Sequence, residues 1–282
     1  MKNRIPLFRR VLVLLALWFT ASAASAQTQT VPVAVDVNGQ VATIRVGPEA
    51  SPVADITLTF DSAAGLSASS LGVSAQMVNP ANPALLARLA NPQLLQVDGA
   101  FPLLVTVEPP AAGGLQFQRT VRVEVHTHAL SYSVGSSYRL FKAPVGGQFR
   151  DITDEIAPGS VRARGTTGGF SQFLVLTDLR ESDVVVAEKF DRLRGTLATL
   201  DAGERAPLSA MLGDAEAAVS AEDYVAAGNH LDAFRARVSA RAGKGIAQVW
   251  QAGGGVENPA GELLAGAATL KYSIAYLRDY GL

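Results

Sequence analysis

The chain contains no cysteine and only three histidines among its 282 residues. The missing thiols exclude disulfide bonds, a thiolate zinc site, a cysteine nucleophile and the acylated cysteine of a lipoprotein. The sequence also lacks a Gly-x-Ser-x-Gly elbow, a Ser-x-x-Lys motif and the phosphate-loop frame that would have to surround Gly243-Lys244-Gly245. We therefore predict a protein that is not an enzyme, with no catalytic residue, no cofactor and no metal ion.

Charged residues make up only 17% of the chain and aromatic residues 7%. The formal net charge of −1 gives no overall attraction to nucleic acid or to anionic lipid. One local basic cluster has no aromatic residues between its charges for stacking on bases; it consists of Arg235, Arg237, Arg241 and Lys244. We interpret this cluster as solvated side chains that interact favourably with the C-terminal end of a helix. The alternative is a patch that binds a small anion or an acidic polymer. We expect no nucleic-acid partner.

Long hydrophobic runs are also missing, and the most apolar segment covers only residues 11–19. It is far shorter than the roughly 20 residues that cross a bilayer. Basic residues precede it, and the small residues Ala24-Ser25-Ala26 follow it. This order predicts a cleaved signal peptide over residues 1–26, and so a secreted or periplasmic protein without a membrane span after cleavage. The segment holds four of the 24 basic residues and none of the 25 acidic ones, so its removal would leave a formal net charge of −5.

Residues 27–180 show the period of two that is typical of β-strands. Asn38-Gly39 lies between two alternating runs and predicts a tight hairpin, because both residues tolerate a positive φ. Further short runs alternate with turn residues, and residues 83–89 could form one or two helical turns after Asn82-Pro83. The pattern predicts an antiparallel β-sandwich of immunoglobulin-like type, either one sandwich or two small ones.

Residues 117–130 form the longest predicted strand, and its two faces differ sharply in polarity. Val121, Val123 and Val125 face one way, while Glu124, His126 and His128 share the opposite face with Arg122. Glu124, His126 and His128 could bind zinc or copper, but the run offers no fourth ligand. A polar, solvated strand face is the favoured interpretation.

From about residue 181 to 282 the period changes to that of helices. Four helices are predicted: one after an N-cap at Ser182, one over 205–219, one after a cap at Ser220, and one over 259–280. A short apolar helix is predicted over residues 246–250. Together they predict a small antiparallel helical bundle after the β domain.

Residues 222–242 resemble the FIMAH-type helical module of secreted and surface bacterial proteins. Asn229, Leu231, Ala233 and Phe234 match its Asn-x-Leu-x-Ala-Phe core, and the likeness covers roughly the last 100 residues. Residues 140–144, 149–153 and 168–173 are similar to the closing strands of exported bacterial β-sandwich proteins of uncharacterised function that carry a similar tail. Neither resemblance implies a catalytic residue.

Three further sets of residues could carry chemistry. Asp151, Asp154 and Glu155 could supply paired carboxylates for a glycoside hydrolase, although acids in a turn are ordinarily solvated. The only clustered aromatic candidates for a glycan site are Tyr132, Tyr138 and Trp250, with Trp250 in the helical part. His230 is interpreted as a helix-surface residue, and Ser171 as a turn or solvent-facing residue of a strand.

The leading hypothesis is therefore a non-enzymatic exported protein that acts as an interaction or structural module with a protein or cell-envelope partner. The second is a secreted carbohydrate- or peptidoglycan-binding protein, and the third is a hydrolase with an unrecognised carboxylate site. An exposed aromatic row would favour glycan binding.

Overall fold

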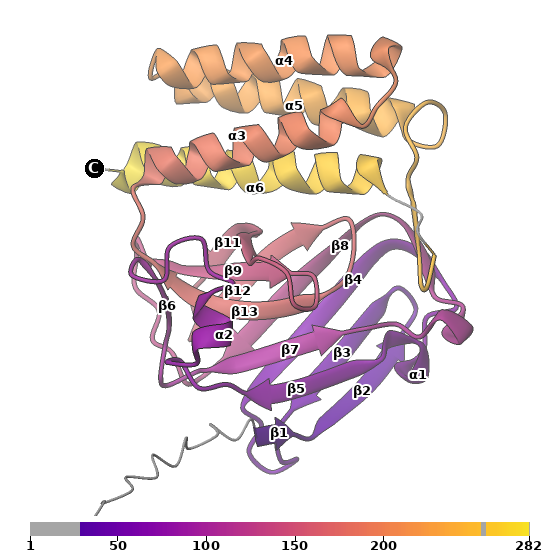
Figure 1. Cartoon of the computed structure of the whole chain (residues 1–282), viewed down its shortest axis with the longest axis vertical. Helices are drawn as coiled ribbons and strands as arrows, with labels where there is room; N and C mark the ends of the chain where they lie inside the picture. The colour runs from indigo at the N-terminus through magenta and orange to yellow at the C-terminus, as the bar shows by residue number, and fades with distance from the viewer. Residues whose placement is uncertain (1–28, 255–257, 282) are drawn as a thin grey trace, which may run out of the picture.

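The computed structural model describes residues 29–254 and 258–281 (Figure 1). The predicted signal peptide, residues 1–26, lies outside the described residues. Among the residues described, no helix is long and apolar enough to cross a membrane.

Two antiparallel sheets of seven strands each are formed by the first part of the chain together with one late strand, β14. The first sheet contains, in spatial order, β1 (Gln29–Val31), β5 (Val73–Met77), β7 (Leu103–Val107), β13 (Gln172–Asp178), β9 (Tyr138–Ala143) and β10 (Arg150–Asp151), with β6 (Leu95–Val97) also paired to β13. The second contains β11 (Thr153–Ala157), β12 (Val161–Thr167), β8 (Gln116–Thr127), β4 (Ala54–Ala64), β3 (Val41–Val46) and β2 (Val33–Asn38), with β14 (Val249–Gln251) also paired to β8.

The inner faces of these sheets pack into one sandwich, as the alternation of apolar residues predicts. Val121, Val123 and Val125 of β8 are buried in this core, and Ile56 and Leu58 of β4 lie in it with them. The hairpin at Asn38-Gly39 is confirmed, since β2 pairs with β3 and Gly39 has a φ of 61°. Three short helical segments interrupt the strands: α1 (Ala68–Leu71), α2 (Pro83–Leu86) and η1 (Ala111–Gly113). The predicted helical turn after Asn82 is α2, and the Asn82 side chain caps it.

Four long helices follow the sandwich, in agreement with the change of period. They are α3 (Ser182–Ala198), α4 (Ala202–Ser220), α5 (Tyr224–Arg241) and α6 (Pro259–Tyr280). In Figure 1, α3 and α6 lie next to the sandwich and α4 and α5 lie beyond them. The apolar stripes predicted for these helices form their common core, with Phe190, Leu212 and Phe234 buried in it.

The predicted helix caps are partly wrong. Ser182 is the first residue of α3, and Glu181 occupies the N-cap without a side-chain hydrogen bond. Ser220 is the last residue of α4, where its hydroxyl donates to the Glu216 carbonyl. Asp223 caps α5 instead, because its carboxylate accepts from the Ala226 amide at 2.9 Å.

The predicted apolar helix over residues 246–250 is also wrong. Residues 249–251 form β14, which pairs with β8 and brings Trp250 opposite Phe117. The Trp250 ring stacks on Phe117 and meets Phe170 edge-on, at centroid distances of 5.1 and 5.3 Å. Trp250 therefore belongs to the sandwich, because aromatic burial against its sheet outweighs continuation of the helical pattern.

Candidate functional site

The junction between sandwich and helices contains most of the buried charge of the described residues. Helix α6 packs against β8, β11 and β12. At the centre of the junction, Lys189 of α3 and Asp151 of β10 form an ion pair of 2.7 Å between Nζ and Oδ2, with both side chains almost fully buried. Lys189 also donates to the Thr269 carbonyl of α6 at 3.1 Å. One lysine thus connects the sheet to both helices that face it.

Asp151 is ionised in this setting. Burial alone would raise its pKa, but the nearby charges of Lys189 and Arg139 hold the pKa below its ordinary value. The amide and hydroxyl of Thr153 also donate to its Oδ1, at 2.8 and 2.6 Å. The sequence-based interpretation of Asp151 as a solvated turn residue is wrong, because Asp151 lies in the short strand β10 and is buried against Lys189 of α3.

A row of tyrosines lies at one end of this junction. Tyr272, Tyr276 and Tyr280 follow one another at intervals of four residues on α6, and therefore share one face of the helix. The ring centroids of Tyr276 and Tyr280 are 5.1 Å apart, and those of Tyr272 and Tyr276 are 6.4 Å apart. Tyr280 keeps 47% of its surface exposed. We call these three residues the tyrosine row.

Arg139 of β9 reaches this row from the sheet. Its guanidinium lies over the Tyr276 ring at 4.1 Å from the centroid, and over Tyr272 at 5.4 Å. The same group donates to the carbonyls of Ser136 and Tyr138, which fixes its position. The loop between β8 and β9 closes over the row as well, since the Tyr276 hydroxyl donates to the Gly135 carbonyl at 3.0 Å.

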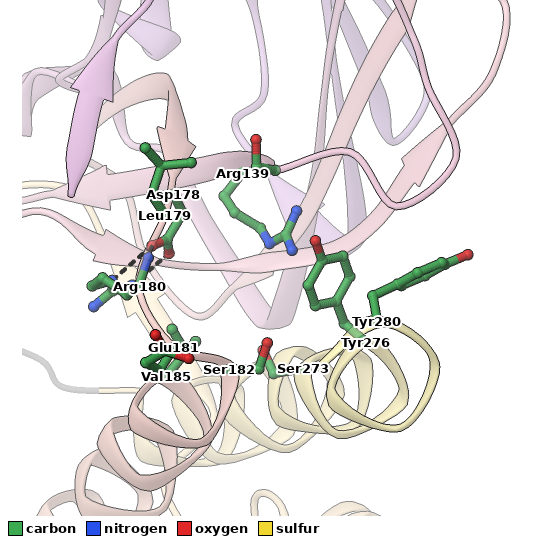
Figure 2. A pocket seen from close by; sticks show the side chains of 11 residues that line it. Arg139, Asp178, Leu179, Arg180, Glu181, Ser182, Val185, Ser273, Tyr276 and Tyr280 are labelled. Carbon is green, nitrogen blue, oxygen red and sulfur yellow. Dashed lines mark hydrogen bonds and ion pairs between the residues drawn. The ribbon is translucent and has the colours of Figure 1, made fainter. Parts of the chain in front are cut away.

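Tyr276 and Tyr280 of the tyrosine row form, together with Arg139, one wall of a cleft of about 260 Å³ between the sheet and the two inner helices (Figure 2). The opposite wall carries Asp178 and Arg180, which form an ion pair of 2.7 Å. Arg180 also pairs with Glu188 of α3 at 2.6 Å. A second hollow, which contains Tyr132, adjoins the cleft across Tyr276 and Tyr280. Four of the six tyrosines thus gather around these two adjoining hollows, and the volume of the cleft lies just below the roughly 300–1,000 Å³ typical of small-molecule sites.

Comparison with protein-family models matches residues 14–278 to DUF6689, a family of unknown function. The chain belongs to that family. No curated protein and no solved structure matches it. The match covers Arg139 and Tyr276 of the cleft and Tyr272 of the adjoining hollow, and it ends just before Tyr280. The resemblance to the FIMAH-type module stays a prediction.

The histidine pair of this DUF6689 protein lies where the sequence predicts, on the outer face of β8. The imidazoles of His126 and His128 are 4.7 Å apart, and both contact the Ser160 hydroxyl. Glu124, the third residue of the metal hypothesis, is occupied by hydrogen-bonded ion pairs with Arg162 and Arg164. Burial lowers the pKa of His126, which favours its neutral form. Within residues 29–254 and 258–281, no three His, Asp or Glu side chains form a group that could hold a metal ion.

The three carboxylates proposed for hydrolysis also have protein partners in the DUF6689 chain. Asp154 accepts from the Thr166 hydroxyl, and burial raises its pKa. Glu155 pairs with Arg122 and Arg164, at 2.7 and 2.8 Å. None of the three carboxylates, Asp151 included, is among the residues that line the cleft of Figure 2.

The aromatic candidates of the DUF6689 protein do not form the predicted group. Tyr132 lines the hollow beside the tyrosine row, Tyr138 donates to Asp98 at 2.9 Å, and Trp250 packs on the sandwich. The tyrosine row is not among the site residues predicted from the sequence, although its spacing of four residues within a predicted helix is a usable signal. Of the remaining candidates, His230 is half-buried on α5, Ser171 is buried, and Arg241 of the basic cluster pairs with Glu204.

Glu262 lies at the other end of the junction between sandwich and helices, near the start of α6. It pairs with Arg150 at 2.6 Å and with the buried Lys142 at 3.3 Å. Burial opposes its ionisation, yet Lys142 and Arg150 lower the pKa of Glu262 to about 2.

A depressed carboxylate pKa stabilises the folded state above the unfolded pKa, and this contribution is lost as the pH falls through the folded value. We therefore expect Glu262→Gln to lower the free energy of unfolding at pH 7 by about 1–3 kcal/mol. The difference from the unsubstituted protein should shrink between about pH 5 and pH 2. Urea unfolding across this pH range measures it, and a difference that stays constant down to pH 2 would contradict the assignment.

Proposed function

We propose that this protein is a non-enzymatic binding protein that acts in the periplasm or outside the cell, and that the cleft of Figure 2 holds its partner. The observation that carries this proposal is the convergence of the tyrosine row and Arg139 on one concave surface. Tyrosine rings offer large contact area at low conformational cost and a hydroxyl for hydrogen bonding. Such a surface suits the recognition of a ligand. Arg180 is already paired with Asp178 and Glu188, so these ionic groups stabilise one another.

The proposal that the protein is exported rests on the sequence of residues 1–26, in which basic residues, an apolar run and small residues follow one another. The absence of cysteine is compatible with it, because a sandwich and a helical core of this size do not need disulfides.

A saccharide of the cell envelope is the ligand class that the cleft favours. Sugar rings stack on aromatic faces through their C–H groups, and their hydroxyls bond to arginine and tyrosine. Tyr280 is the member of the tyrosine row with the most exposed ring, while Arg139 covers a face of Tyr276. The cleft volume of about 260 Å³ admits about one sugar ring rather than a folded peptide.

The test compares Tyr280→Ala with Tyr280→Phe, which keeps the ring. Because the side chain is 47% exposed, neither change should reduce stability by more than about 1 kcal/mol. We expect the unsubstituted protein to co-sediment with purified peptidoglycan, Tyr280→Phe to keep this affinity, and Tyr280→Ala to weaken it about tenfold.

Two results would contradict the proposal. Equal co-sedimentation of the Ala and Phe variants would show that the ring of Tyr280 takes no part in binding. Turnover of a generic glycoside by the purified protein would show that it is an enzyme, and would favour the hydrolase alternative.

A further inference from the structure

A groove larger than the cleft of Figure 2 lies at the opposite end of the junction from the tyrosine row. It has a volume of about 650 Å³ and opens between the β12–β13 turn, Trp250, α3 and the start of α6. Helix α6 has 22 residues and is about 33 Å long, so this groove and the tyrosine cleft are separate sites. We call it the cationic groove.

The charges that line the cationic groove do not balance. Its cations are Lys142, Arg150 and Arg192, and Glu262 is its one carboxylate among the described residues. Glu262 pairs with Lys142 and Arg150, so the lining keeps a surplus of two positive charges. Buried or half-buried cations normally have anionic partners, because desolvation of an uncompensated charge is costly.

Arg192 is the cation with the least compensation. Its recorded hydrogen bond runs from Nη1 to the Asp151 carbonyl at 3.3 Å, and no carboxylate in the described part of the chain lies within 4 Å of it. Burial, together with the charge of Arg150, lowers the pKa of Arg192 to about 10, and the more distant charges of Asp151, Glu188 and Glu262 offset only part of this shift. The guanidinium thus lines the groove, and most of its N–H donors have no protein acceptor among the residues that the structure describes.

Two further donors face the same space. The Lys142 ammonium bonds to the Thr167 hydroxyl at 2.6 Å and has a third proton to donate beyond its contact with Glu262. Gly169 separates this ammonium from the Trp250 indole: a Cβ there would lie 3.3 Å from the indole Nε1 and 3.7 Å from Lys142 Nζ. No acceptor within the described ranges bonds to that indole nitrogen. Arginine, ammonium and indole N–H therefore line one groove beside a flat aromatic ring.

We propose that the cationic groove binds the oxyanion of a small ligand, a carboxylate or a phosphate, with Arg192 and Lys142 as its charge partners and Trp250 against the ligand body. A planar guanidinium is suited to both oxyanions, and charge-assisted hydrogen bonds are the strong ones. Glu262 competes with the ligand for Lys142 and Arg150. The site is independent of the tyrosine cleft, so either can fail without the other.

The test is isothermal titration of the full chain at constant ionic strength with two probes, inorganic phosphate and sodium glucuronate. We expect saturable binding of at least one probe, and the preferred probe distinguishes a phosphate site from a carboxylate site. Arg192→Gln should weaken that binding about tenfold or more, and Glu262→Gln should strengthen it, because a competing anion is removed.

Arg194→Gln is the matched control, since Arg194 lies on the same helix, pairs with Asp191 and Glu216, and lines a different part of the surface. The Arg194→Gln variant should bind the preferred probe with the same affinity as the unsubstituted protein. We expect the affinity for the probe to fall in Arg192→Gln and to rise in Glu262→Gln. General destabilisation would lower the affinity in both variants, so the opposite changes distinguish it from the loss of a ligand contact. Absence of saturable binding of both probes up to roughly 10 mM, or unchanged affinity in Arg192→Gln, would overturn the proposal.

Discussion

Replacing Lys189 by methionine is expected to lower the free energy of unfolding by about 3–5 kcal/mol. The substitution keeps an unbranched side chain as far as the Cε position but leaves the Asp151 carboxylate buried without its 2.7 Å partner. It also removes the hydrogen bond to the Thr269 carbonyl, which connects α3 to α6. Urea unfolding followed by circular dichroism measures the loss.

A double substitution separates the ion pair from the packing around it. Asp151→Asn together with Lys189→Met removes both charges and keeps an oxygen that can accept from Thr153. We expect it to recover at least about half of the loss, because an unpaired buried charge costs more than a neutral polar group. Arg194→Met on the exposed side of α3 should cost less than about 1 kcal/mol. A loss below about 1 kcal/mol in Lys189→Met would show that the junction does not depend on this pair.

Gly261→Ala is expected to reduce stability by about 3 kcal/mol or more, for a steric reason. Gly261 lies in the first turn of α6, and a Cβ there would collide with the Arg119 carbonyl of β8. Arg119 has little freedom to move, because its φ is 57° and its carbonyl accepts from the Asn258 side chain at 2.7 Å. The same asparagine caps α6 by accepting from the Gly261 amide at 2.9 Å.

Gly213→Ala is the matched control for this prediction. Gly213 lies inside α4, and a Cβ there would have no neighbour within 4 Å. Alanine in a helix interior is favoured over glycine by about 0.5–1 kcal/mol, so this variant should be more stable than the unsubstituted protein. Thermal unfolding of the two variants should therefore shift in opposite directions. If Gly261→Ala also unfolds at a higher temperature, α6 does not lie close enough to β8 for a Cβ at position 261 to collide with the Arg119 carbonyl.

The fold was largely predictable because each part has a strong local pattern. The alternation around Val121, Val123 and Val125 gives a strand with one apolar face, and Asn38-Gly39 sets its own turn type. The helical spacing after residue 181 is equally regular. The helix predicted over residues 246–250 is wrong because Trp250 packs on Phe117 and Phe170, which lie far away in the sequence.

The candidate site was much less predictable. Asp151 looked like a solvated turn acid, and nothing near it in sequence reveals that Lys189 will cover it. Arg139 lies on β9, and Tyr276 lies on α6, more than 130 residues later. Their contact depends on the packing of α6 against β8, β11 and β12, which the sequence does not reveal. The spacing of the tyrosine row could have been recognised, but its place on a concave surface depends on that packing.

The most direct test of the binding proposal is to map where a saccharide contacts the protein. Backbone amide chemical shifts would be recorded during titration with a soluble disaccharide-peptide fragment of peptidoglycan. We expect the shifts to concentrate on Gly135, Arg139 and residues 272–280, and to be lost in Tyr280→Ala. Shifts confined to another surface, or no saturable shifts at all, would contradict the proposal that this cleft is the binding site.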